Sequence, residues 1–259
     1  MTTSAPHAVG RWFQPSDTDP EAGMRLFLFP HAGSGASIYR DWPPLLPADI
    51  THQTVQLPGR QDRLGEAGFT EMEPLVEALC DAFVAEHDGR PYAFFGHCMG
   101  AQLAYRLTLA LQERGEQTPL LIGASGWAPE GFLVVTAEQA RMPEPELLGW
   151  IRSLGSVPKE IMDDPQALAT VIPAMRADLE VVASYVDDGA AVRIPVVTYS
   201  GRSDQLMEAG AMDSWLPRTP DYLGNSEFQG DHFYINDNAL PITLDLTRHM
   251  RRLAAAARR

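Results

Sequence analysis

The sequence predicts an α/β fold in which a mostly parallel central sheet is flanked by helices. Short apolar segments typical of strands alternate with segments of helical length, which is the pattern of a parallel sheet covered on both faces. The chain has 259 residues, of which 45% are apolar, and this is enough for one sizeable hydrophobic core. Because α/β domains of about 200 to 250 residues are ordinary single units, we expect residues 1–259 to form one domain.

Five apolar segments are the predicted strands, at residues 26–29, 54–57, 92–95, 120–124 and 195–199. Apolar residues at helical spacing predict a helix over 70–87, and Thr70 with Glu73 fits a capping box at its start. The same spacing predicts a second helix over 101–114. We expect Gly115 to end it, because glycine readily adopts the left-handed conformation found after a helix.

Residues 129–189 interrupt this alternation. The segment is rich in proline, and its apolar residues follow helical rather than strand periods. We interpret it as a helical lid inserted over the edge of the sheet. The alternative is that these are further crossover helices, and periodicity alone does not separate the two.

The charge of the chain argues against two classes of partner. The formal net charge is −14 and the pI is near 4.8, whereas nucleic acids and anionic membranes are bound by clustered cations. No apolar run approaches the roughly 18 residues of a membrane span, and residues 1–17 lack the apolar core of a signal peptide. We therefore expect a cytoplasmic protein that binds neither nucleic acid nor membrane.

The clearest local motif is Gly96-His97-Cys98-Met99-Gly100, between a predicted strand and a predicted helix. This is the context of a nucleophile elbow, G-x-nucleophile-x-G, in which glycines let strand and helix pack closely while the nucleophile stays exposed. The N-terminus of the following helix offers N–H groups to a developing oxyanion. We predict that Cys98 is the nucleophile. The alternative is a buried cysteine acting as a small hydrophobic residue, which we expect of Cys80.

An elbow nucleophile needs an acid and a base later in the chain, in that order. Asp204 follows the predicted strand 195–199, at the end of the sheet where α/β sites assemble, and it is the predicted acid. His232 lies in a glycine-led loop before the last helix and is the predicted base. Three other aspartates could replace Asp204: Asp213, Asp221 and Asp231.

The loop after the first predicted strand, Pro30-His31-Ala32-Gly33-Ser34-Gly35, can turn a backbone N–H into the site. The N–H groups of Ala32 and Met99 are the expected oxyanion hole. The alternatives are an ordinary glycine turn or a phosphate-binding loop, although the full fingerprint G-x-G-x-x-G is absent from this segment.

With these motifs the chain resembles the type II thioesterases, separate α/β-hydrolases that accompany polyketide and nonribosomal peptide synthases. The resemblance extends from Leu26 to the last helix and rests on five separated motifs. They are Phe29-Pro30-His31-Ala32-Gly33, Leu57-Pro58-Gly59-Arg60, Gly96-His97-Cys98-Met99-Gly100, residues 173–178 followed by Tyr185, and Gly230-Asp231-His232-Phe233. Ser34 is a mild departure from the family, which tends to have glycine there.

The resemblance implies an α/β-hydrolase fold with a flexible helical lid beside a pantetheine tunnel. It also implies hydrolysis, in trans, of acyl groups held on the phosphopantetheine arm of acyl or peptidyl carrier proteins. The family's nucleophile, acid and base map onto Cys98, Asp204 and His232, and its oxyanion donors map onto Ala32 and Met99. We expect a monomer that needs no metal and no cofactor of its own, because the phosphopantetheine belongs to the carrier protein.

Cys98 is the large departure, because the family has serine at this position. A neighbouring histidine ionises a thiol more easily than a hydroxyl. The acyl-cysteine intermediate is itself a thioester, so its formation is nearly reversible. Hydrolysis through acyl-Cys98, favoured by the similarity over the whole chain, is the first hypothesis, and transfer of an acyl or aminoacyl group between carriers is the second. A non-catalytic module that binds carrier proteins is the third.

Two further alternatives concern Cys98. Dienelactone-type hydrolases also use an elbow cysteine, but they do not account for the other four motifs. The sequence also does not distinguish a natural cysteine from an engineered replacement of serine. Because carrier proteins are commonly acidic, docking would need local cations. Arg60, Arg63 and Arg202 are candidates, and ordinary solvated arginines are the alternative at each position.

Overall fold

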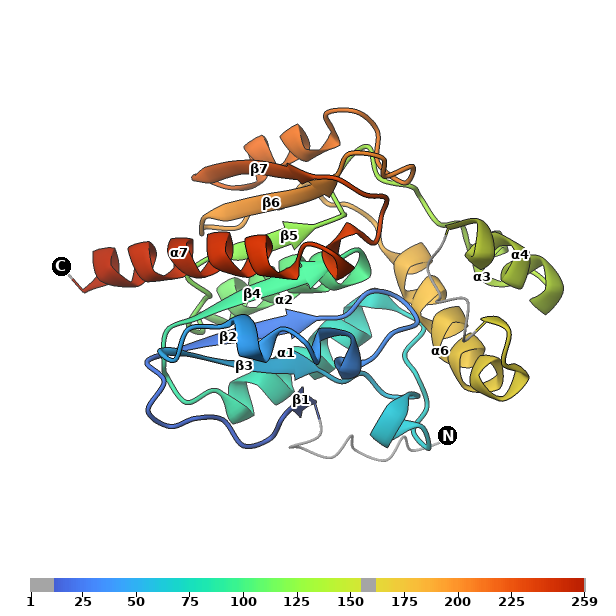
Figure 1. The fold of residues 1–259 in the computed structure, drawn as a ribbon, viewed down its shortest axis with the longest axis horizontal. Coiled ribbons are helices and arrows are strands. Elements are labelled where there is room, and N and C mark those ends of the chain that lie inside the picture. Colours follow the sequence, from blue (N-terminus) through green and yellow to red (C-terminus); the bar gives the residue numbers. More distant parts are fainter. Residues whose placement is uncertain (1–11, 155–161, 259) are drawn as a thin grey trace.

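A computed structural model describes residues 12–154 and 162–258, and within them the chain forms a seven-stranded sheet (Figure 1). The strand order is β1-β3-β2-β4-β5-β6-β7. The pairing of β1 with β3 is antiparallel and the other pairings are parallel. The bounds are β1 Phe13–Gln14, β2 Met24–Phe29, β3 Ile50–Val55, β4 Tyr92–His97, β5 Ile122–Ser125, β6 Val196–Gly201 and β7 Tyr222–Phe228.

Four of the predicted strands correspond closely to β2, β4, β5 and β6, but the prediction for β3 was displaced. That strand begins at Ile50 rather than at residue 54 and ends at Val55. Its first half is polar, and Gln53 is buried because its amide bonds to Arg25 and to the carbonyl of Pro15. Two strands were not predicted. β1 has only two residues, and β7 has half-buried and exposed positions but no fully buried one.

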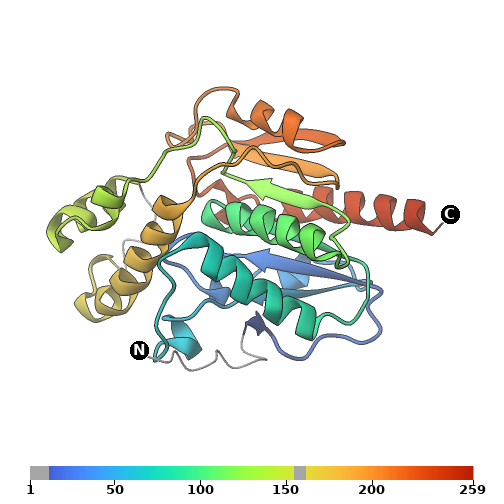
Figure 2. The ribbon, with the colours of Figure 1, turned by 180° about the vertical axis from the view of Figure 1, so that it is seen from behind.

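Helices cover both faces of the sheet. α1 (Met72–Glu86) and α2 (Met99–Arg114) pack on one face, and α7 (Ala239–Ala257) packs on the other (Figures 1 and 2). Each face has its own buried cluster, with Leu79 and Leu103 in the first and Leu246 in the second. This is the arrangement expected of a doubly covered parallel sheet.

The helix ends were predicted with mixed success. Gly115 ends α2 in the left-handed conformation, as predicted. The capping box of Thr70 and Glu73 is wrong, because α1 begins after Glu71 without a side-chain cap. Instead, the N–H of Met72 donates to the hydroxyl of Ser184 at 2.8 Å, so a residue distant in sequence supplies the missing acceptor.

Three helices lie together beyond the end of the sheet: α3 (Ala137–Ala140), α4 (Glu144–Leu154) and α6 (Pro165–Ser184) (Figures 1 and 2). They confirm the helical periodicity read between residues 129 and 189. Their apolar residues, including Leu147, Ile151, Met175 and Leu179, form a third buried cluster. We describe these three helices below as the helical cap. In the described part of the chain, every helix is too short or too polar to cross a membrane.

Candidate active site

Cys98 occupies the turn between β4 and α2, with a positive φ of 55°. Such a backbone is uncommon for a residue other than glycine and marks a strained turn. Its N–H donates to the carbonyl of Ser125 on the neighbouring strand at 2.8 Å. The side chain is partly exposed, in contrast to that of Cys80, which lies on the buried face of α1.

The two glycines of the motif are required by close packing. A Cβ on Gly96 would lie 2.1 Å from the carbonyl oxygen of Gly100, and a Cβ on Gly100 would lie 2.0 Å from the carbonyl oxygen of Phe29. Both contacts are with backbone atoms, so a side chain could be accommodated only by moving a strand or the helix. The glycines therefore allow α2 to begin directly against β2 and β4.

Asp204 and His232 meet although they are 28 residues apart in sequence. Asp204 follows β6 and His232 follows β7, and Nδ1 of the histidine lies 2.7 Å from Oδ2 of the aspartate. The other carboxylate oxygen of Asp204 accepts the N–H of Leu206 at 2.9 Å, which fixes the carboxylate. Both side chains are buried. Asp231 instead accepts the N–H of Phe233, so Asp204 is the aspartate bound to this imidazole.

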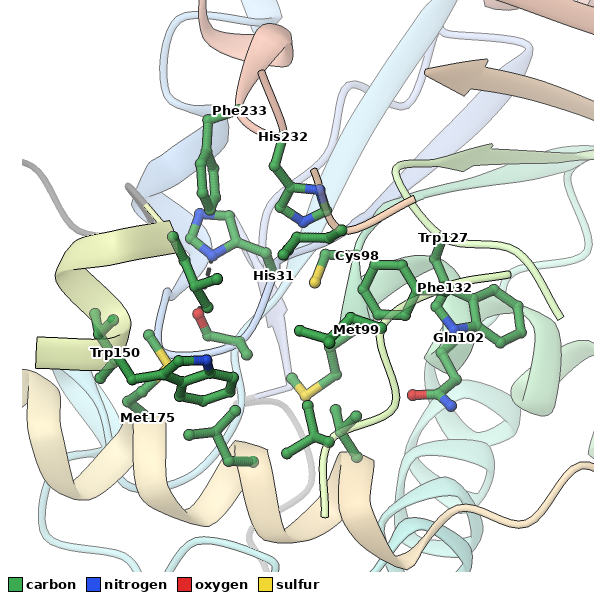
Figure 3. A pocket seen from close by; sticks show the side chains of 18 residues that line it. His31, Cys98, Met99, Gln102, Trp127, Phe132, Trp150, Met175, His232 and Phe233 are labelled. Carbon is green, nitrogen blue, oxygen red and sulfur yellow. Dashed lines mark hydrogen bonds between the residues drawn. The ribbon is translucent and has the colours of Figure 1, made fainter. Parts of the chain in front are cut away.

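The environment of His232 favours its protonated form. Burial alone would lower its pKa, but the electrostatic and hydrogen-bonding interactions with Cys98 and Asp204 outweigh burial and raise the pKa to about 10. Asp204 occupies Nδ1, so Nε2 is the ring nitrogen left for the sulfur. Figure 3 shows the sulfur of Cys98 beside the His232 ring. A proton taken from the thiol can therefore be held on the imidazole.

A second histidine, His97, lies behind the first. Its ring centre is 4.8 Å from that of His232, and its Nδ1 lies 2.9 Å from the hydroxyl of Ser125. Ser125 in turn contacts the hydroxyl of Tyr234 at 2.5 Å. Burial and the neighbouring His232 hold the pKa of His97 well below its ordinary value, so its ring is neutral. A neutral ring here adds no charge repulsion against a protonated His232.

The loop that carries Ala32 is tied to the helical cap. The N–H of Gly33 donates to Oδ2 of Asp178 on α6 at 2.7 Å. Arg60 binds the same carboxylate through two nitrogens, at 2.5 and 2.7 Å, and also donates to the carbonyl of Ser34 at 3.0 Å. Arg60 and Asp178 are both almost fully buried. The loop, the arginine and α6 thus form one connected unit.

Two of the three arginines predicted as candidates for docking a carrier protein, Arg60 and Arg63, are buried in ion pairs, which corrects that prediction. Arg60 is 5% exposed and holds Asp178, and Arg63 is 1% exposed and holds Glu66 with its cation over the Trp12 ring. Neither guanidinium is presented at the surface. Arg202 is different, since 58% of its side chain is exposed beside Glu227.

A pocket that is partly open to solvent leads from Cys98 towards the helical cap (Figure 3). Ala32, Met99 and His232 line this pocket together with Cys98, so the predicted oxyanion donors and the predicted base lie in one cavity with the cysteine. Most of the remaining lining is apolar, with large contributions from Trp127, Phe132, Trp150, Met175 and Leu179. Such a pocket suits an apolar acyl chain with its carbonyl beside Cys98.

Comparison with protein families decides the assignment. The model of the thioesterase domain matches residues 24–250. This protein belongs to the thioesterase family. The thioesterase is thereby an enzyme, a hydrolase, and its expected α/β-hydrolase fold is confirmed.

Individual relatives agree with this family. The thioesterase is 25% identical over 248 residues to the gramicidin S biosynthesis protein GrsT of Aneurinibacillus migulanus, covering 95% of this chain and 96% of that protein. It is 28% identical over 247 residues to the thioesterase PikA5 of Streptomyces venezuelae, covering 93% and 86%. Among solved structures, the RedJ thioesterase from the prodiginine pathway in Streptomyces coelicolor has a TM-score of 0.79 and 29% identity, covering 88% of this chain and 86% of that one.

Three features of the site were not assigned from sequence. Asp178 lay within a family motif but received no role, because its contact with Gly33 spans 145 positions. His97 was treated only as a flanking position of the elbow. Gln102, a polar residue in the mostly apolar pocket, lies within a predicted helix, and only its place four residues after Cys98 could have indicated it.

Proposed function

We propose that this thioesterase acts in trans on acyl groups bound to the phosphopantetheine arm of carrier proteins, in polyketide or nonribosomal peptide biosynthesis, as a type II thioesterase. The observation that carries the proposal is the position of Cys98 beside the His232–Asp204 pair in a mostly apolar pocket. The names of the relatives support the setting, since GrsT belongs to gramicidin S biosynthesis and RedJ to the prodiginine pathway.

The proposed first half-reaction forms an acyl-Cys98 thioester. The Cys98 sulfur attacks the carbonyl of the bound thioester, and the thiol proton resides on His232. The N–H groups of Ala32 and Met99 are the proposed donors to the oxyanion of the tetrahedral intermediate. When this intermediate collapses, the bond to the pantetheine sulfur breaks, and the leaving thiolate takes the proton from His232.

The second half-reaction regenerates the enzyme. His232, now neutral, removes a proton from water, and the resulting hydroxide attacks the acyl-Cys98 carbonyl. The carboxylic acid is released, and the Cys98 sulfur recovers a proton from His232. Asp204 is proposed to orient the imidazole throughout and to stabilise its cation. The protein needs no cofactor of its own for these steps.

Transfer is the second candidate function, and the chemistry of Cys98 favours it. An acyl-cysteine thioester is comparable in energy to its donor, so a pantetheine thiol of another carrier can accept the group as well as water can. In that case His232 would deprotonate the incoming thiol. The helical cap, which we propose to be the lid over this pocket, would then determine whether water or a second arm reaches the intermediate.

One experiment separates the candidates. An acyl-loaded carrier protein is incubated with the enzyme, with and without a second, unloaded carrier, and free acid, released thiol and intact mass are followed. Hydrolysis predicts free acid at the same rate in both reactions. Acyl groups that stay on the enzyme until the second carrier is added, and then appear on that carrier, would establish transfer. Neither adduct nor thiol release would leave a carrier-binding module and reject both enzymatic proposals.

Carrier docking is part of the proposal. Arg202 is the candidate cation that remains accessible, and it lies two residues before the proposed acid Asp204. Its interaction with Glu227 at 2.6 Å is at the surface and therefore weak, so an acidic carrier could compete for the guanidinium. Arg202→Ala is expected to raise KM for an acyl carrier protein and to leave KM for free acyl-pantetheine unchanged.

A further inference from the structure

Gln102 places a buried amide in a pocket that is otherwise mostly apolar. The residue is 3% exposed and projects from α2 among the side chains that line the cavity (Figure 3). An apolar residue of similar size, such as leucine or methionine, would extend the apolar lining without an amide. A buried amide is normally stabilised by a hydrogen-bond partner.

No such partner is found in the described part of the protein. The amide oxygen of Gln102 is buried and has no hydrogen bond to any of the described residues. Nε2 of His232 is also buried without a hydrogen bond, but it is the nitrogen left for the Cys98 sulfur, whereas the Gln102 oxygen has no such role in the proposed mechanism. Leaving a buried acceptor unpaired is destabilising, so a ligand that donates a hydrogen bond there relieves that cost as well as adding a contact.

The position of Gln102 indicates which part of a substrate it would meet. Its backbone N–H donates to the carbonyl of Cys98 at 3.3 Å, so the two residues are one helical turn apart. Cys98 directly precedes α2, so Gln102 lies about 6 Å farther along the helix axis. Gln102 is thus within one turn of Cys98, where the carbonyl end of an acyl chain would be attached.

We propose that Gln102 is a specificity-determining residue that selects acyl groups carrying a hydroxyl or amine close to the thioester, a role that rests on the proposed thioesterase function. The O–H or N–H of the substituent donates to the Gln102 amide oxygen. An acyl chain without such a substituent leaves that oxygen unpaired in the complex. The apolar walls formed by residues such as Trp127 and Phe132 then accommodate the rest of the chain.

Binding of matched analogues tests the proposal without depending on turnover. Pantetheine amides of butyric, 3-hydroxybutyric and 3-aminobutyric acid have an amide nitrogen in place of the thioester sulfur, so Cys98 cannot be acylated. Calorimetry gives Kd for each. One net hydrogen bond predicts that wild type binds a donor-bearing amide about five- to tenfold more tightly than the butyryl amide. The hydroxy and amino compounds show which donor is preferred.

Two variants remove the amide: Gln102→Leu and Gln102→Met. In whichever of them folds, the Kd values of the donor-bearing and butyryl amides are expected to become equal. Leu179→Val is the matched control, because it changes an apolar wall of the same pocket and should shift all Kd values alike. The proposal is overturned if wild type binds all three amides equally, binds none of them, or if the preference persists in the apolar variants.

The underlying function is tested separately. Wild type is given the butyryl and 3-hydroxybutyryl pantetheine thioesters, and thiol release is measured. A preference in Kd without any thiol release would reject the proposed hydrolysis while supporting the role of Gln102. Thiol release without a preference in Kd would support the proposed hydrolysis and reject the role of Gln102.

Discussion

The carboxylate of Asp178, on helix α6 of the cap, accepts the backbone N–H of Gly33 at 2.7 Å. Gly33 directly follows Ala32, one of the proposed oxyanion donors. The charge of Asp178 is balanced by Arg60, which also holds the carbonyl of Ser34. The conformation of the loop that carries Ala32, called the oxyanion loop below, is therefore coupled to the position of α6. A movement of α6 would change the position of this loop.

Asp178→Asn should reduce both stability and activity. The substitution leaves the buried guanidinium of Arg60 without its counter-ion, and breaking a buried pair in this way costs about 3 kcal/mol or more. Misplacement of the loop is expected to lower kcat by at least about tenfold, since small errors in geometry are costly at a reacting centre. Urea unfolding and hydrolysis of an acyl-pantetheine thioester measure the two effects.

Asp49→Asn is the control for that variant. Asp49 also pairs with an arginine, Arg251, but at the surface, where about half of each side chain is exposed. A surface pair contributes about 1 kcal/mol or less, so stability should change little and kcat should not change. Equal kcat values for the two variants would refute the coupling of Asp178 to the oxyanion loop.

Gly100→Ala should abolish the folded state or destabilise it by at least about 3 kcal/mol, because its Cβ would lie 2.0 Å from the carbonyl oxygen of Phe29. Gly149→Ala provides the comparison. Gly149 is also within a helix, α4, and an added Cβ there would meet nothing within 4 Å. That variant should be more stable by up to about 1 kcal/mol, through helix propensity. Stability is measured as the midpoint of unfolding in urea. Equal midpoints for the two variants would contradict the packing described for the elbow.

Stability should fall between pH 6.5 and about 10 because of His232. Its pKa is raised from 6.5 to about 10 in the folded protein, so over this range the folded state holds a proton that the unfolded chain has released. The contribution is complete below pH 6.5 and is lost as the pH rises through 10, with a slope of at most about 1.4 kcal/mol per pH unit. Unfolding of wild type and His232→Gln is compared from pH 6 to pH 10. A variant whose stability falls as steeply as that of wild type would show that His232 does not retain this proton.

The sequence was most informative where chemistry depends on neighbouring positions. The elbow could be predicted because Gly96, Cys98 and Gly100 act within one turn. The strand before this turn and the helix after it are each predicted by their own apolar pattern. Asp204 and His232 could be placed because sites in parallel sheets gather at the carboxyl ends of strands. Each of these inferences needed only local pattern and general topology.

Contacts between distant segments were beyond such reasoning. The capping box at Thr70 was a sound local pattern, yet Ser184 from α6 supplied the acceptor instead. Arg60 was read as a surface cation, because sequence does not reveal that Asp178 buries it. Likewise, nothing local to Gln102 shows that its side chain faces a cavity. Ser184 and Asp178 both belong to helix α6 of the cap, and the pocket beside Gln102 is lined by residues from several separate elements.

Turnover by Cys98→Ala tests the central claim most directly. Wild type and variant are mixed with an acyl-pantetheine thioester, thiol release is recorded, and the protein is quenched and digested for mass analysis. Wild type should release thiol and carry the acyl group on the peptide containing Cys98, whereas the variant should release thiol at least about a thousandfold more slowly and carry none. Thiol release by the variant at the rate of wild type, or an acyl group found on another residue, would contradict catalysis through Cys98.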